Sequence, residues 1–346
     1  MVESVPQSGT VMLSDRSKGR TARSVSVYGV MTTVMALTPL VVFVPAALFH
    51  CALRIGRRAS WAAATLAIVL GVAYMMQVTS SPSMTADTLH LAWASFLAVT
   101  LCVIVPALLV TPMVQRGESF GRVVVFALLA SVIGLVSTEQ AVRLATGASP
   151  LALQVAQTHD TAMKVTEMYR AGDAPAELVR RMKEWTGYGM IVLPAWLVID
   201  VALVFILSLL MLGRLKAWRD VVTSRGELDK QGAWAFRSFT LPEGLLFAFV
   251  LGGLTPFTTG LLQKISANVL TVVAFLYLLQ GLAVLRGVLI AAGVSVAGSL
   301  VAFMFIGVLV FMGVGLLLLA VVGLFDPFFH FRNFKRKDES HESHSD

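Results

Sequence analysis

The fold class is decided by residues 188–213, which read YGMIVLPAWLVIDVALVFILSLLMLG and carry one charged side chain, Asp200. A helix needs about 20 predominantly apolar residues to cross the hydrocarbon core of a bilayer, so this stretch is long enough. Inside a bilayer the backbone N–H and C=O groups must be bonded within the protein, and an α-helix achieves this within one segment. The stretch therefore predicts a transmembrane helix.

Further apolar runs of similar length flank it. Together they predict about eight transmembrane helices, at residues 28–53, 61–79, 89–113, 121–143, 188–213, 242–263, 267–289 and 298–324. Of the 346 residues 57% are hydrophobic and 14% are charged, whereas roughly a quarter are charged in soluble domains. This composition excludes a soluble globular enzyme, a disordered chain and a disulfide-stapled domain. We expect an all-α, polytopic integral membrane protein.

Polar stretches divide the chain into parts. Residues 1–27 are basic, with Ser, Gly and Thr between the charges, and we expect a disordered tail. Residues 148–186 are polar and amphipathic, and predict two short helices on the membrane surface, with Trp185 and Tyr188 at the boundary. The expected layout is a five-span part at 28–213 that contains this insert, a basic cytoplasmic linker at 214–240, a three-span part at 241–334 and a disordered polar tail at 335–346.

The charges also predict orientation. The net charge is +7, and most Lys and Arg lie beside apolar runs, which indicates topology determinants and anionic-lipid contacts and no nucleic-acid partner. The loop at 80–88 has no Lys or Arg and is expected outside, whereas the linker at 214–240 has six and is expected inside. A single first span would then put the basic N-terminus outside. A hairpin over Tyr28–Leu53, broken at Pro39 and Pro45, removes this conflict; both alternatives stay open, as does the side of the C-terminus.

Polar side chains inside apolar spans are candidates for a binding site, because they are costly in a membrane. Glu139 and Arg143 lie one turn apart and either pair with each other or, with Gln140, line a ligand cavity. Asp200 either supports helix association or serves a ligand, ion or proton site, where a backbone carbonyl freed by Pro194 can help.

Asn268 and Gln280 lie about 120° apart around the seventh span, so they do not form one stripe. Gln280 precedes Gly281, which favours an interhelical hydrogen bond, with ligand contact as the alternative. Asp326 lies in an aromatic run and is expected to be an interfacial anchor that pairs with Arg332 or Arg336. The hypothetical ligand-binding set is Glu139, Gln140, Arg143, Asp200, Asn268 and Gln280.

Signals for catalysis or for a cofactor are not found in the sequence. It has no GxSxG, HExxH or P-loop motif, so we do not expect an enzyme. Cys51 and Cys102 form no CxxC pair, and we expect small buried hydrophobes without a metal.

Three stretches carry a family resemblance. Residues 267–287 read ANVLTVVAFLYLLQGLAVLRG, residues 323–336 read GLFDPFFHFRNFKR, and residues 39–56 read PLVVFVPAALFHCALRIG. These motifs resemble the YybS-like family of predicted bacterial membrane proteins, a domain of unknown function numbered 2232. That family is distantly similar to the S components of energy-coupling-factor transporters and to the rod-shape protein MreD. The resemblance implies an S-component-like core in the bacterial cytoplasmic (inner) membrane.

Two functions remain open. The first is S-component-like binding or transport of a small solute, for which a partner ATPase or an ion gradient must supply energy. The alternative is a non-transporting scaffold in cell-envelope assembly, MreD-like, that docks a partner membrane protein among the membrane lipids. One cavity that joins the polar set would favour the first function, and separate pairings at helix contacts would favour the second.

Overall fold

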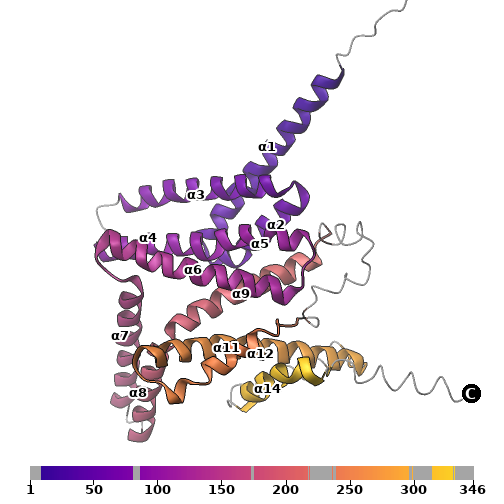
Figure 1. Ribbon diagram of the computed structural model, residues 1–346. Coiled ribbons are helices and arrows are strands. Elements are labelled where there is room, and N and C mark those ends of the chain that lie inside the picture. Colours follow the sequence, from indigo (N-terminus) through magenta and orange to yellow (C-terminus); the bar gives the residue numbers. More distant parts are fainter. Residues whose placement is uncertain are drawn as a thin grey trace, which may run out of the picture. The chain divides into compact units, whose positions relative to one another are not determined.

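The computed structural model describes residues 9–80, 86–172, 175–216, 218, 236, 239–295, 298, 314–329 and 331. Within these ranges the chain forms helices and no β-strand (Figure 1). The elements are α1 (Gly9–Ala36), the 3-10 helix η1 (Pro39–Phe43), α2 (Val44–Arg54), α3 (Arg57–Thr79), α4 (Ala86–Val99), the π-helical turn η2 (Thr100–Ile104), α5 (Val105–Gln115), α6 (Phe120–Thr146), α7 (Pro150–Ala171), α8 (Ala176–Ile191), α9 (Leu193–Arg214), α11 (Leu245–Gly252), the 3-10 helix η5 (Thr255–Phe257), α12 (Gly260–Ala291) and α14 (Val314–Phe329). The all-α prediction is confirmed.

Helix lengths and hydropathy show a multi-pass membrane protein. Five of the described helices are long and apolar enough to cross a membrane: Arg57–Thr79, Thr88–Gln115, Phe120–Thr146, Leu193–Arg214 and Gly260–Ala291. Three shorter apolar segments accompany them: Pro39–Arg54, Leu245–Phe257 and Gly315–Phe329. Helices α7 and α8 are not among these candidate segments, and the expectation that residues 148–186 lie on the membrane surface stays a prediction.

The chain divides into two compact units. The first comprises Met1–Glu118, Leu129–Ala141 and Leu203–Glu227, and the second comprises Ser119–Leu128, Val142–Ala202 and Leu228–Asp346. Helices α6 and α9 contribute residues to both units. The division therefore does not follow the linear order of the chain.

Helix α1 begins at Gly9, so the chain is helical over most of the segment expected to be a disordered tail. The expectation for residues 1–27 is wrong for residues 9–27, and residues 1–8 lie outside the described ranges. Arg and Lys are good helix formers, and a helix that has already nucleated grows by one backbone hydrogen bond per added residue. A polar composition alone therefore does not end this helix. The tail at 335–346 and most of the linker at 214–240 also lie outside the described residues.

The first predicted span is a helical hairpin in the first unit. The chain turns at Thr38, whose Oγ1 accepts a hydrogen bond from the Leu40 N–H at 3.3 Å. Helix α2 then runs back beside α1, since the Tyr28 hydroxyl and Nδ1 of His50 are hydrogen-bonded at 2.7 Å across 22 residues of sequence. The structure decides for the hairpin over Tyr28–Leu53. A hairpin that enters a membrane returns to the side from which it came, so this arrangement is compatible with the predicted cytoplasmic N-terminus.

Side chains that donate to backbone carbonyls join the helices of the first unit. Ser131 Oγ donates to the Cys102 carbonyl at 2.7 Å, within the widened π-helical turn η2. A Cβ at Gly134 would overlap the Leu101 carbonyl oxygen, so α6 approaches this turn closely. Similar bonds run from Gln115 to Ala52, from Ser60 to Leu48 and from Ser208 to Val42. Bonds of this kind commonly hold helices together in membranes.

In the second unit, α11 ends after eight residues at Gly252, and the turn η5 leads to α12. The expectation of one spanning helix over 242–263 is wrong. Gly252 and Gly253 weaken the helix and Pro256 cannot donate a backbone hydrogen bond, so these residues end it. Helix α12 begins at Gly260, inside the run predicted as the sixth span, and is 32 residues long.

Helix α12 is the central element of the second unit. The Phe249 ring of α11 packs edge-on against Tyr277, with centroids 5.8 Å apart. On α14, a Cβ at Gly323 would overlap the Tyr277 carbonyl oxygen, and a Cβ at Gly281 would overlap the Leu319 carbonyl oxygen. Glycines thus let α12 and α14 cross with their backbones in contact, and α12 positions the groups described next.

Candidate functional site

Helices α8 and α9 are separated by a break beside Pro194. Helix α8 ends at Ile191, and α9 begins at Leu193, whereas the span was predicted to begin at Tyr188. Proline lacks an N–H and clashes with the carbonyl four residues earlier, so it is tolerated in the first turn of a helix. The break separates the Ala195 N–H from the Ile191 carbonyl, which would bond in an unbroken helix.

The Asn268 side chain of α12 fills this break. Its Oδ1 accepts a hydrogen bond from the Ala195 N–H at 2.8 Å, and its Nδ2 donates to the Ile191 carbonyl at 2.9 Å. Nδ2 also donates to the Lys264 carbonyl of its own helix at 2.7 Å. One amide therefore bonds both groups that the break separates. Asn268 therefore engages the Ile191 carbonyl, whereas the carbonyl that Pro194 itself leaves without an N–H donor is that of Met190.

Gln280 lies about three turns further along α12 and is fully buried. Its Oε1 accepts a hydrogen bond from the Leu241 N–H at 3.0 Å, and its Nε2 donates to Asp326 Oδ2 at 3.4 Å. Leu241 leads the chain through Pro242 into α11, and Asp326 belongs to α14. One buried amide thus ties two other segments to α12. This is the interhelical role that the sequence offered for Gln280.

Asp326 has a buried partner that the sequence did not predict. It is only 5% exposed, lies within α14 and is bonded to Gln280, whereas its expected role as an interfacial anchor stays a prediction. Arg332 and Arg336 lie outside the described residues. A signal was present in the sequence: a carboxylate at the end of an apolar helix needs a hydrogen-bond donor when it is buried.

A cavity of about 460 Å³ opens beside this tie, wholly within the second unit. Its walls come from residues 241–244, Leu246 and Phe247 at the start of α11, from Tyr277 of α12, and from Leu324, Pro327 and Phe328 of α14. Binding sites for small molecules typically have volumes of roughly 300–1,000 Å³ and are mostly apolar, with few polar groups. The cavity fits this description. Gln280 holds two of the walls but is not among the described lining residues.

The remaining members of the predicted set lie elsewhere. Asp200 is exposed on α9, Gln140 and Arg143 are exposed on α6, and Glu139 is partly buried. Asn268 and Gln280 share α12 but are about 18 Å apart along its axis. None of the six predicted residues is among the described residues that line the cavity. The structure brings Gln280 together with Asp326, which the sequence analysis had assigned to a different role.

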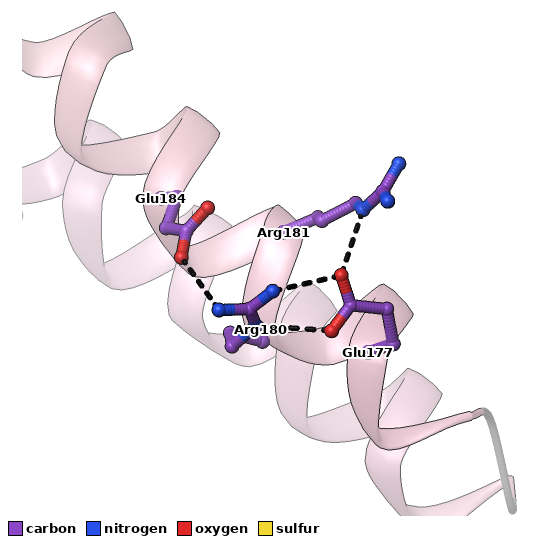
Figure 2. A network of polar contacts seen from close by, with 4 residues as sticks. All are labelled: Glu177, Arg180, Arg181 and Glu184. Carbon is purple, nitrogen blue, oxygen red and sulfur yellow. Dashed lines mark hydrogen bonds and ion pairs between the residues drawn. The ribbon is translucent and has the colours of Figure 1, made fainter.

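Outside the spans, α7 and α8 form a charged hairpin. Glu177 in the first turn of α8 accepts bonds from Arg180 at 2.9 and 3.0 Å and from Arg181 at 3.0 Å, and Arg180 also lies 3.8 Å from Glu184 (Figure 2). These hydrogen bonds from Arg180 and Arg181 hold the pKa of Glu177 below its usual value. All four side chains are more than half exposed, so the network lies on the surface of α8.

A family model for predicted membrane proteins (DUF2232) matches residues 24–327. The chain belongs to this family. The DUF2232 match includes the α1–α2 hairpin, the Pro194 break and both α12 amides. No curated protein and no solved structure matches the chain. The distant similarity to S components and MreD therefore stays a prediction.

The described lining of the cavity holds one carboxylate, Glu243, and one hydroxyl, on Tyr277. Over the part of the chain that the structure describes, no three His, Cys, Asp or Glu side chains group to hold a metal ion. Cys51 and Cys102 are both buried.

Proposed function

We propose that this protein is a non-transporting scaffold of the bacterial inner membrane, which docks a partner membrane protein on the exposed face of α9. The observation that carries the proposal is the exposure of Asp200 on a helix with a mean hydropathy of 2.6. A carboxylate in the hydrocarbon core costs about 3 kcal/mol even on the most lenient scale. A partner helix that offers a cationic or N–H donor to Asp200 removes this cost.

The residues around Asp200 support a helix-docking face. Trp196, Leu203, Leu207 and Met211 are also exposed, and they recur with Asp200 at intervals of three or four residues. Such spacing places side chains on one face of a helix. Asp200 lies about 10 Å from the start of α9, so a hydrocarbon core about 30 Å thick that begins near Leu193 would contain it. The face is thus an apolar stripe with one embedded charge.

The separate pairings of the other polar residues also favour a scaffold. Asn268 completes a broken helix and Gln280 ties two segments to α12, so both amides serve helix contacts. Neither lies among the described lining residues of the cavity. A transport pathway that uses these amides would have to break the bonds that hold the helices together.

Photo-crosslinking in native membranes tests the docking face. A photoreactive phenylalanine analogue at Trp196, one turn from Asp200, should give one discrete protein adduct, and Asp200→Asn should remove it. The matched control carries the analogue at Leu144, which is 87% exposed on α6, and should give lipid adducts. If the Trp196 position captures only lipid, or if its adduct survives Asp200→Asn, the scaffold proposal is wrong.

The second candidate is S-component-like binding of a small solute, with a partner ATPase or an ion gradient if the solute is moved. The cavity of about 460 Å³ favours this candidate, because buried hydrogen bonds to Gln280 fix its walls. Native mass spectrometry of the purified protein separates the two functions. A co-purified small molecule supports solute binding, and a stoichiometric protein partner supports the scaffold.

A further inference from the structure

We infer that the cavity beside Leu241 binds an organic cation with an apolar body, such as a quaternary ammonium that carries an aromatic or alkyl group. The inference rests on the solute-binding candidate and is independent of the docking face on α9. It names the chemical class of the ligand, which follows from the rings, the charge and the rigidity of the cavity walls.

Three aromatic rings line the cavity, and each comes from a different helix. Phe247 of α11 is 74% exposed and Phe328 of α14 is 60% exposed, whereas Tyr277 of α12 is 3% exposed. The lining thus combines one buried aromatic residue with two exposed ones. Aromatic faces attract cations within about 6 Å of the ring centroid, and several rings together form the cages that hold quaternary ammonium groups.

The charge of the lining selects the sign of the ligand. Glu243 is the one ionisable carboxylate among the described lining residues, and none of them is Lys, Arg or His. Glu243 is exposed, so it can meet a ligand without a rearrangement of the wall. An anion would face a negative carboxylate and negative ring faces. A cation is attracted by both the carboxylate and the ring faces. Its apolar body can pack against Leu246, Leu324 and Pro327.

The walls are held in place before any ligand binds. Gln280 is bonded both to Leu241 on one wall and to Asp326, which is adjacent to Pro327 on the other wall. The backbones of α12 and α14 are in contact at Gly281 and Gly323, which prevents the two helices from closing further. Because the cavity is already formed, the protein loses little conformational entropy when a ligand binds. The affinity for a small cation can therefore be high enough to measure.

Calorimetric titration of the full chain in detergent tests the inference. The probe is benzyltrimethylammonium, and the matched neutral compound is neopentylbenzene, in which carbon replaces the charged nitrogen. The probe should bind with one-to-one stoichiometry, and the neutral compound should bind at least about fivefold more weakly. Glu243→Gln should raise the Kd of the probe about tenfold, and Phe328→Leu about threefold, with unchanged gel-filtration profiles.

Asp160→Asn is the matched control, since it removes an exposed carboxylate on α7 away from the cavity lining. The inference is overturned if the probe does not bind, if neopentylbenzene binds equally well, or if Glu243→Gln behaves like Asp160→Asn. Release of a lipid when the probe binds identifies a cationic lipid headgroup as the natural occupant. Binding without lipid release identifies a free solute. These results leave the α9 crosslink unaffected, so each proposal fails separately.

Discussion

Asn268 Oδ1 accepts a hydrogen bond from the Ala195 backbone N–H at 2.8 Å, across 73 residues of sequence. The same amide donates to the Ile191 carbonyl, so one helix supplies the backbone partners that another helix lost at Pro194. In a bilayer no water is available to take that place, and a broken span depends on its neighbour.

The first prediction concerns this break. Asn268→Ala should lower the free energy of unfolding by about 1–3 kcal/mol, because two buried backbone groups lose their partner. In a Pro194→Ala background the cost should be smaller, since Ala195 can then bond Ile191 within a continuous helix. Denaturant titration in detergent micelles measures both values. Thr271→Ala is the control, since its hydroxyl bonds within its own helix, and equal costs in both backgrounds would contradict the assignment.

A second prediction concerns the tie made by Gln280. Gln280→Leu keeps most of the side-chain volume but leaves the buried Leu241 N–H without its acceptor. The expected loss is about 1–3 kcal/mol, together with faster hydrogen exchange at the Leu241 amide. Gln263→Leu, at an exposed position of the same helix, serves as the control and should leave that exchange rate unchanged. Unchanged exchange in Gln280→Leu would show that the tie is not formed.

The crossing of α12 and α14 gives a third prediction. Gly323→Ala places a methyl group against the Tyr277 carbonyl, so the helices must separate, at a cost of about 1–3 kcal/mol. Gly187→Ala on α8 is the control, because open space surrounds that glycine, and its better helix propensity should raise stability slightly. Thermal unfolding in detergent compares the two variants. Equal midpoints would mean that the glycines do not set the crossing.

A fourth prediction is a pH dependence of the α7–α8 hairpin. The pKa of Glu177 is lowered in the folded chain by hydrogen bonds from Arg180 and Arg181. Its contribution is therefore complete above the unfolded value of 4.5 and is lost as the pH falls through the lowered value. Limited proteolysis between Ala171 and Ala176 should accelerate in that acid range. Glu177→Gln should remove the pH dependence, and Glu167→Gln on α7 should retain it.

The hairpin of α1 and α2 yields a fifth prediction, about topology. In a background without Cys51 and Cys102, an impermeant thiol reagent applied from outside should label Ser83→Cys. It should spare Ser224→Cys and also Ser8→Cys, because a hairpin returns the chain to the side from which it entered. Labelling of Ser8→Cys from outside would show that the first predicted segment, Tyr28–Leu53, crosses the membrane once. Labelling of Ser224→Cys would overturn the orientation as a whole.

Apolar length is a property of local sequence, and it predicted the membrane class and most of the long apolar helices. The partners of polar side chains depend on how distant helices meet. Leu241 and Asp326 lie 39 and 46 residues from Gln280 in the sequence. Rules based on the spacing of residues within one helix do not predict contacts over such separations. The cavity lining was missed for the same reason, because it is assembled from three separate segments.

Breaks inside apolar runs were the other source of error. Hydropathy does not distinguish one long helix from two short ones, so the run at 242–263 was read as a single span. The residues that end α11, Gly252, Gly253 and Pro256, were visible in the sequence. Their effect was underestimated because glycine and proline are tolerated in many membrane helices when a neighbour supplies the missing bonds.

The α1–α2 hairpin bears on how the chain is made. A hairpin that enters and leaves the membrane on one side would make α3 the first segment that must cross the membrane during synthesis. The arginines that precede and begin α3, Arg54, Arg57 and Arg58, then emerge from the ribosome directly before that first crossing. On the predicted topology these arginines would keep the start of α3 in the cytoplasm, and the direction of each later helix would follow from that of α3.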